Sequence, residues 1–250
     1  MDSRGAILSE LLNIGEAMLQ NGAEVKRVED TLDRMGKAYG AVRMNVFVIT
    51  SSIVITMVFA DNQEVTQTRR ILTPGGTDFG KLEDFNALSR RYCEDPVPDR
   101  DLSLIVKEKT EAKPDKRKLY AGSVLAAGSL AVFFGGNLAD GLAAGIFAVL
   151  ICFMQRKLPP FCTNKVIFNL ICSFITGISI CIAARLFPVT HGDKIIIGDI
   201  MLLIPGIAMT NAVRDVLVGD TISGIMRLIE SLLWACSLAC GFMAAVWLFS

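Results

Sequence analysis

The chain has 250 residues, of which 52% are hydrophobic and 20% are charged, and its 25 basic residues equal its 25 acidic residues in number. A formal net charge of +0 gives no reason to expect a nucleic-acid partner, because such partners are bound by basic surfaces. Charged residues are concentrated in the first 118 positions and thin out afterwards. This pattern indicates a soluble domain joined to a membrane domain.

Residues 1–112 are predicted to form a small α/β domain. Apolar residues at helical spacing predict a first helix that ends at Asn21-Gly22 and a second helix over about 23–39 that stops at Gly40. Two stretches rich in β-branched residues follow, "VRMNVFVITSSIVITMVFAD" and "EVTQTRRIL", and they predict strands that turn on a polar loop. A further helix is predicted over about 78–94, before a linker with two prolines.

Residues 113–250 are predicted to form a transmembrane domain. A bilayer core about 30 Å thick needs about 20 helical residues to cross it. The apolar stretches leave room for about five spans, at about 119–137, 139–155, 164–187, 195–217 and 225–249. The second span is short, and Pro205-Gly206 interrupts the fourth. The expected fold class is therefore an α-helical membrane protein with an N-terminal α/β domain.

The orientation follows from the basic residues near the ends of the predicted spans. They gather before the first span, between the second and third, and beside the fourth-to-fifth loop: Lys113, Lys116, Arg117, Lys118, Arg156, Lys157, Lys165, Arg214 and Arg227. These places are expected to face the cytoplasm. We therefore predict a multi-pass protein of the plasma (inner) membrane with a cytoplasmic N-terminal domain and its C-terminus outside.

Residue types that carry catalysis or bind metals are sparse. The seven cysteines form no CxxC pair, and the single histidine, His191, is expected to be a solvated loop residue. The α/β domain offers no nucleophile–base pair and no cluster of metal ligands. The sequence therefore predicts no enzyme activity, no cofactor and no metal.

The interrupted fourth span is the predicted solute site. Pro205 removes a backbone donor, Gly206 lets the backbone approach a solute, and the half-helix that follows would point its positive end at a carboxylate. Asn211 offers both a donor and an acceptor. Asp199 has two interpretations: a proton-coupling carboxylate, or a group that Lys194 and water keep charged near the outer interface.

Charged residues of both domains are candidates for gating or coupling: Arg214, Asp215, Asp220 and Arg227 in the membrane domain, and Glu24, Arg27 and Glu29 in the α/β domain. The spacing permits a Glu24–Arg27 pair on one helical face. Arg227 can pair with Glu230 or across to Asp215. Structural or surface ion pairs are the alternative interpretation of these groups.

Three segments together resemble the threonine/serine exporter family: "LLNIGEAMLQNGAEVKRVEDTLDRMGKAYG", "TQTRRI" and "LLIPGIAMTNAVRDVLVGDTISGIMRLIESLL". The resemblance covers nearly the whole chain. Its most specific part is an ordered series of residues: Gly22, Arg27, Glu29, Pro205, Gly206, Asn211, Asp215, Gly219, Asp220, Gly224 and Arg227. It implies a cytoplasmic α/β domain followed by five membrane helices, and export of small hydrophilic metabolites across the plasma membrane.

Members of this family occur as fused chains or split pairs, and the sequence resembles the larger member of a split pair. The resemblance thus implies a small membrane-protein partner in a hetero-oligomer, with threonine or serine as the carboxylate-bearing solute. Export of succinate or another C4-dicarboxylate is one alternative, and a membrane-anchored regulatory subunit is another. Nothing in the sequence resembles an ATPase site, so coupling to the proton gradient is the hypothesis.

Overall fold

The computed structural model describes residues 3–72, 76–96, 99–111, 115–162 and 164–249. The chain divides into two compact units. Unit 1 contains Met1–Lys113 and Ile207–Leu228, and unit 2 contains Pro114–Gly206 and Ile229–Ser250. The predicted domain boundary at 112–113 lies outside the described residues. Unit 1 thus includes a segment from the region of the fourth and fifth predicted spans.

Two helices form the centre of unit 1. α1 spans Ser3–Gln20 and α2 spans Val25–Ala38, in agreement with the first two predicted helices. Gly22 has a φ of 89° and Gly40 a φ of 105°, which is the left-handed conformation that commonly ends a helix. The apolar faces of both helices lie in one buried core, with Ile7, Leu11, Val28 and Leu32 among its members.

A three-stranded antiparallel sheet follows, with the strand order β1-β2-β3. β1 spans Arg43–Ile49, β2 spans Ser52–Val58 and β3 spans Glu64–Arg70. The first β-branched stretch therefore holds two strands, joined at Thr50-Ser51, and the polar loop predicted after it separates β2 from β3. Alternate residues of β2 point into the core, as the period of a strand requires: Ile53, Ile55 and Met57.

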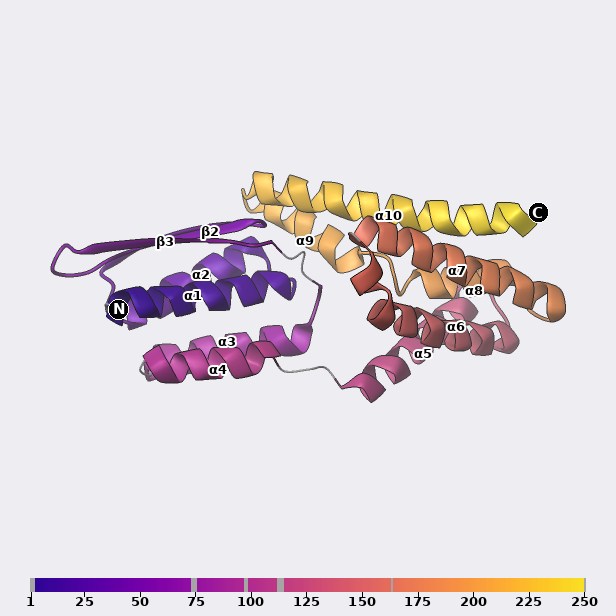
Figure 1. The fold of residues 1–250 in the computed structure, drawn as a ribbon, viewed down its shortest axis with the longest axis horizontal. Helices are drawn as coiled ribbons and strands as arrows, with labels where there is room; N and C mark the ends of the chain where they lie inside the picture. Colours follow the sequence, from indigo (N-terminus) through magenta and orange to yellow (C-terminus); the bar gives the residue numbers. More distant parts are fainter. Residues whose placement is uncertain (1–2, 73–75, 97–98, 112–114, 163, 250) are drawn as a thin grey trace. The chain divides into compact units, whose positions relative to one another are not determined.

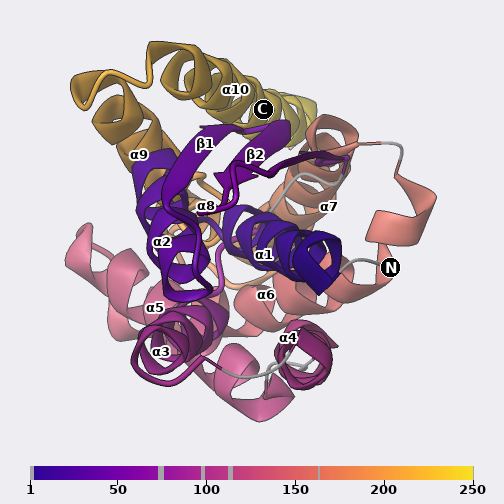
Figure 2. The same cartoon turned by 90° about the vertical axis from the view of Figure 1, so that its left-hand side faces the viewer.

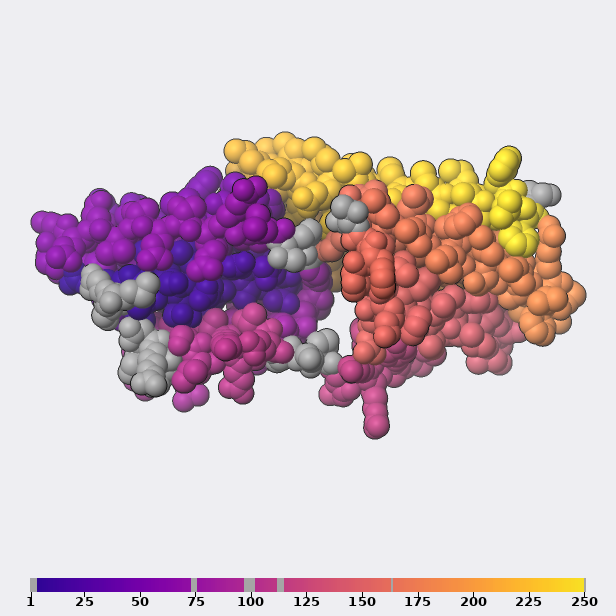
Figure 3. Space-filling model, in the orientation of Figure 1, coloured from indigo at the N-terminus to yellow at the C-terminus, as the bar shows by residue number. Residues whose placement is uncertain are grey.

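Unit 1 has three layers, which Figures 1 and 2 show from two sides. The sheet covers one side of α1 and α2, and α3 (Phe79–Glu94) and α4 (Asp99–Glu111) cover the other. α3 agrees with the prediction, whereas no prediction covers α4. Leu102 and Val106 of α4 are buried in the core of unit 1. In Figure 3, the indigo atoms of α1 fill the band between the purple strands and magenta α4.

Unit 2 is helical and contains α5 (Lys116–Phe133), α6 (Leu138–Lys157), α7 (Lys165–Leu186), α8 (Gly192–Ile200) and most of α10 (Thr221–Phe249). A short 3₁₀ turn over Pro159–Phe161 follows α6. Small residues bring these helices close together: a Cβ added to Gly198 would lie 2.6 Å from the carbonyl oxygen of Ala127. Such close packing through small residues is typical of membrane helices.

Three helices among the described residues are long and apolar enough to cross a membrane: α6, α7 and α10. They agree with the second, third and fifth predicted spans. The first and fourth spans are not confirmed, because α5 begins with three basic residues and the fourth is divided into α8, of 9 residues, and α9 (Gly206–Leu217), of 12 residues. A helix that crosses the bilayer alone needs about 20. Exposed apolar residues follow a stripe of α6, as a lipid-facing surface requires: Leu142, Ile146, Val149 and Phe153.

Candidate functional site

The predicted break in the fourth span is present. α8 ends at Ile200, and α9 begins at Gly206, directly after Pro205. Because proline has no amide hydrogen, it cannot donate a helical bond back to the carbonyl of Met201. A Cβ added to Gly206 would meet no atom within 4 Å. The space beside the α-carbon of Gly206 is therefore open, while its amide donates to the carbonyl oxygen of Ile204 at 2.9 Å.

Asp199 lies in the last turn of α8 and is fully buried, with 0% of its surface exposed. Neither of its carboxylate oxygens has a hydrogen-bond partner among the described residues. Lys194, the cation suggested to keep it charged, lies instead 3.3 Å from Asp193. A carboxylate buried without a donor or a cation is costly to keep ionised. Protonation of Asp199 would remove this cost.

A second buried carboxylate of unit 2, Asp140, is in contrast fully bonded. Its side chain accepts from the backbone nitrogen of Asn137 at 2.7 Å and from that of His191 at 2.6 Å. The ring nitrogen Nδ1 of His191 lies 3.0 Å from the same carboxylate. His191 is thus exposed, as predicted, but it has a specific partner in Asp140. These bonds link the start of α6 to the start of α8, and they give Asp140 a structural role.

In unit 1, the loop before α2 meets α9 and the start of α10, and we call this contact the α2–α9 junction. Asn211 Nδ2 donates to the carbonyl oxygen of Gly22 at 2.9 Å. Arg214 Nη1 lies 2.6 Å from Glu24 Oε1. The junction therefore joins residues that are 189 and 190 positions apart in the sequence.

A buried ion pair lies beside these contacts. Arg227 Nη1 is 3.1 Å from Asp215 Oδ2, and the side chains are only 13% and 1% exposed. Arg227 Nη2 also donates to the carbonyl oxygen of Ala23 at 3.3 Å. Of the two partners suggested for Arg227, the structure therefore gives Asp215. Because both charges are withdrawn from water, removal of either side chain would leave the other charge buried without its partner.

α9 and α10 cross closely after a tight turn. Gly219 has a φ of 101°, and the amide of Asp220 donates to the carbonyl oxygen of Asp215 at 2.9 Å, which closes the end of α9. A Cβ added to Gly224 would lie 2.7 Å from the carbonyl oxygen of Ala212. Glycine at 224 therefore permits the crossing that brings Arg227 to α9.

The Gly224→Ala variant is expected to unfold more easily, by about 1–3 kcal/mol, because backbone atoms of α9 must move to admit the methyl group. Thermal unfolding of the purified chain in detergent, followed by circular dichroism, measures the change. Gly122→Ala is the matched control, since a Cβ there meets nothing within 4 Å. Equal unfolding temperatures for the two variants would contradict a tight crossing at Gly224.

The side chain of Glu29, a further predicted coupling residue, forms a hydrogen bond with strand β1 of the sheet. Its Oε1 accepts from the amide of Val48 at 3.2 Å. Burial raises the pKa of Glu29 above its ordinary value, and the charge of Asp220 acts in the same direction, while the Val48 amide opposes them. The unfolded chain therefore releases this proton at a lower pH than the folded chain does.

Because the folded-state pKa of Glu29 is raised, its contribution to stability is largest in acid and falls as the pH rises through that pKa. Glu29→Gln keeps an acceptor for Val48 and removes the charge. We expect the variant to have a higher Tm than the parent at neutral pH, and this difference to shrink as the pH falls toward the usual range of a glutamate. Melting curves across this pH range test the expectation, and a difference that is constant with pH would contradict it.

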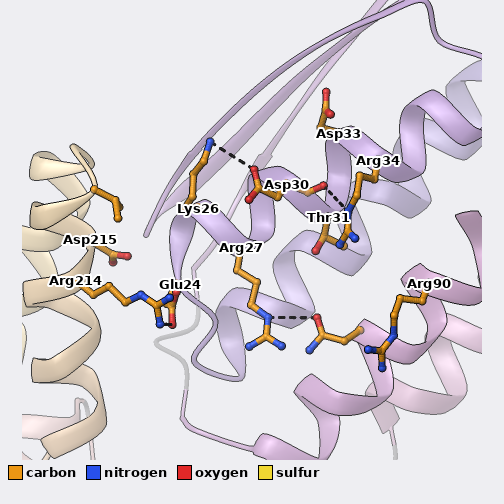
Figure 4. Close-up of a pocket in the computed structure, with 12 residues that line it drawn as sticks. Glu24, Lys26, Arg27, Asp30, Thr31, Asp33, Arg34, Arg90, Arg214 and Asp215 are labelled. Atoms are coloured by element: carbon orange, nitrogen blue, oxygen red, sulfur yellow. Dashed lines mark hydrogen bonds and ion pairs between the residues drawn. The ribbon is translucent and has the colours of Figure 1, made fainter.

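An open pocket of about 700 Å³ lies between α2, α3 and α9 within unit 1. Glu24, Arg214 and Asp215 line one side of it, where Figure 4 shows Arg214 reaching Glu24. The predicted Glu24–Arg27 pair is absent, because Glu24 bonds Arg214 and Arg27 Nε donates to Asn86 Oδ1 at 3.3 Å. No group of three or more His, Cys, Asp or Glu that could hold a metal ion occurs in the described part of the chain.

Comparison with known proteins gives the family. The model of the ThrE family, described as threonine/serine exporters, matches residues 10–249. The chain belongs to the ThrE family. Its three long apolar helices agree with the membrane exporters that make up this family. No curated protein and no solved structure matches the chain.

The residue series that marks the ThrE resemblance is spread over both units. Its members Pro205 and Gly206 lie in unit 2, which also contains the candidate Asp199. Unit 1 brings together four members of the series, Gly22, Asn211, Asp215 and Arg227, with the gating candidates Glu24 and Arg214. Sequence reasoning missed Ala23, Asn86 and Arg90 as polar contacts or pocket residues. Ala23 acts through its backbone carbonyl, which the identity of a side chain does not reveal.

Proposed function

We propose that this ThrE-family chain is one subunit of a secondary exporter that moves threonine and serine out across the plasma membrane. The family match over residues 10–249 supports the proposal most strongly. The broken helix at Pro205 adds to it, since interrupted helices commonly bind the solute in secondary transporters. The empty space beside the α-carbon of Gly206 and the positive end of α9 suit the carboxylate of an amino acid.

The proposal includes the direction of transport and its source of energy. The N-terminal α/β region faces the cytoplasm and the C-terminus lies outside, as the basic residues around the spans indicate. Asp199 exchanges protons with one side or the other during the cycle, so the proton gradient drives efflux. A buried carboxylate with no partner among the described residues supports this role.

A small membrane protein of the same exporter family is the proposed partner, because exporters of this kind occur as split pairs as well as fused chains. Transport then requires both chains in the membrane. The gating residues are those of the α2–α9 junction, where Glu24 and Arg214 form an ion pair.

The experiment is efflux of labelled threonine, serine and succinate from cells loaded with each solute. The chain is expressed alone, with a candidate small partner, and not at all. Efflux of threonine or serine only when both chains are present is the expected result. Efflux of succinate alone would replace the amino acid by a dicarboxylate. No efflux of any solute, with both chains shown to be in the membrane, would favour a membrane-anchored regulatory subunit instead.

A further inference from the structure

Three arginines besides Arg214 line the pocket of unit 1. Arg27 and Arg34 lie seven positions apart on one face of α2, and Arg90 faces them from α3 (Figure 4). None of the three has a carboxylate partner among the residues that the structure describes. Each guanidinium is always charged and offers several donors in one plane.

The carboxylates of the same pocket are already neutralised by other cations. Glu24 pairs with Arg214 at 2.6 Å, and Asp30 lies 3.4 Å from Lys26. Asp33 lies 2.8 Å from Lys37 and Asp215 lies 3.1 Å from Arg227, and both of these cations are outside the pocket lining. The three arginines therefore form an excess of positive charge within the pocket.

The arginines also use only part of their hydrogen-bonding capacity. Arg27 donates through Nε to Asn86, and Arg34 donates through Nε to the carbonyl oxygen of Asp30 at 3.2 Å. No hydrogen bond from their terminal nitrogens is formed to the residues described in the structure. The paired terminal nitrogens of a guanidinium match two oxygens of a carboxylate or phosphate group.

Thr31 provides an independent observation at the same place. It lies on α2 between Arg27 and Arg34, lines the pocket and is 1% exposed. Its hydroxyl has no partner among the described residues, although a helical threonine commonly bonds the carbonyl four residues before it. A buried hydroxyl without a partner costs stability unless a ligand supplies one.

We propose that this pocket binds a small oxyanion with two or more negative charges, either a phosphate-bearing metabolite or a dicarboxylate. Three arginines exceed what the single carboxylate of an amino acid needs, and the ammonium group of an amino acid would be repelled by them. The pocket is therefore distinct from the proposed site of the exported threonine or serine. Binding at this site requires no transport, so it holds whether or not the chain proves to be an exporter.

The test is isothermal titration of the purified full chain in detergent with pyrophosphate, succinate and threonine at constant ionic strength. We expect saturable binding of pyrophosphate or of succinate that threonine does not displace. The two oxyanions distinguish a phosphate site from a dicarboxylate site. Saturable binding of neither oxyanion would overturn the proposal, as would threonine displacing the bound oxyanion.

Variants locate the binding site. The double variant Arg27→Gln/Arg90→Gln is expected to weaken oxyanion binding at least about tenfold, because it removes two charged donors. Thr31→Val keeps the charge and is expected to weaken binding by a smaller factor. Arg91→Gln is the matched control, since Arg91 lies next to Arg90 on α3 but outside the pocket lining.

Binding that survives the double variant would place the oxyanion elsewhere in the chain and overturn the proposal. An equal loss in Arg91→Gln would do the same, because it would show an effect of net charge alone. Circular dichroism melts of all variants confirm that each is folded before titration. Loss of efflux in the transport assay with oxyanion binding intact would count against the exporter proposal and not against this site.

Discussion

Asp199→Asn is expected to reduce efflux driven by an imposed pH gradient to the background level, while the chain still folds and reaches the membrane. Asparagine has nearly the same shape as aspartate but cannot release a proton at any physiological pH. Asp199 is fully buried in unit 2 and has no partner among the described residues, so no ion pair is broken by the change. We therefore expect the Tm of the variant to equal or exceed that of the parent.

The control for this variant is Asp193→Asn, six residues earlier on α8. Asp193 has a side chain that is 68% exposed and pairs with Lys194 at the surface. Its removal is expected to leave efflux unchanged, because exposed pairs contribute little. Efflux by Asp199→Asn at the level of the parent would remove Asp199 from the coupling role. The gradient must be imposed in both directions, so that a defect in coupling is distinguished from a defect in solute binding.

Local sequence signals predict most of the elements but not all of their boundaries. Gly22 and Gly40 adopt the left-handed conformation that ends a helix, so the ends of α1 and α2 follow from the sequence. The break at Pro205 follows in the same way, because the chemistry of proline is local. The sequence does not predict α4, because its apolar residues, such as Leu102 and Val106, occur among many charged residues in a short segment. It is stabilised mainly by packing against the rest of unit 1.

Local sequence signals do not predict the contacts of the α2–α9 junction. Spacing along a helix predicts the neighbours at i+3 and i+4, and this led to a Glu24–Arg27 pair. In the structure Glu24 pairs with Arg214, which is 190 positions away, and no local sequence pattern predicts a contact at that distance. The same holds for the carbonyl oxygens of Gly22 and Ala23, which accept from Asn211 and Arg227 in positions set by backbone geometry. Helical spacing and chain order suggested the Arg227–Asp215 pair as one of two alternatives, but they gave no sign of the pair between Arg214 and Glu24.

The two ion pairs of the junction differ sharply in their burial, and this difference predicts their energies. Arg227→Gln is expected to lower the free energy of unfolding by about 3–5 kcal/mol, because it leaves the Asp215 charge buried without its cation. The bond to the carbonyl of Ala23 is weakened in the same variant. Arg214→Gln breaks the pair with Glu24, but Arg214 has a side chain that is 63% exposed. Its cost is expected to be at most about 1 kcal/mol.

Thermal unfolding of both variants in detergent tests this ordering, with about 2–4 °C of Tm expected for each kcal/mol in a chain of this size. The double variant Asp215→Asn/Arg227→Gln removes both charges and retains polar groups of similar size. It is expected to recover much of the stability lost in Arg227→Gln, because no buried charge then lacks a partner. A double variant less stable than Arg227→Gln would show that Arg227 acts mainly through contacts other than Asp215. Equal unfolding temperatures for Arg227→Gln and Arg214→Gln would show that burial does not determine how much each ion pair stabilises the chain. The exposed pair of Arg214 with Glu24 would then be the candidate for the gating contact.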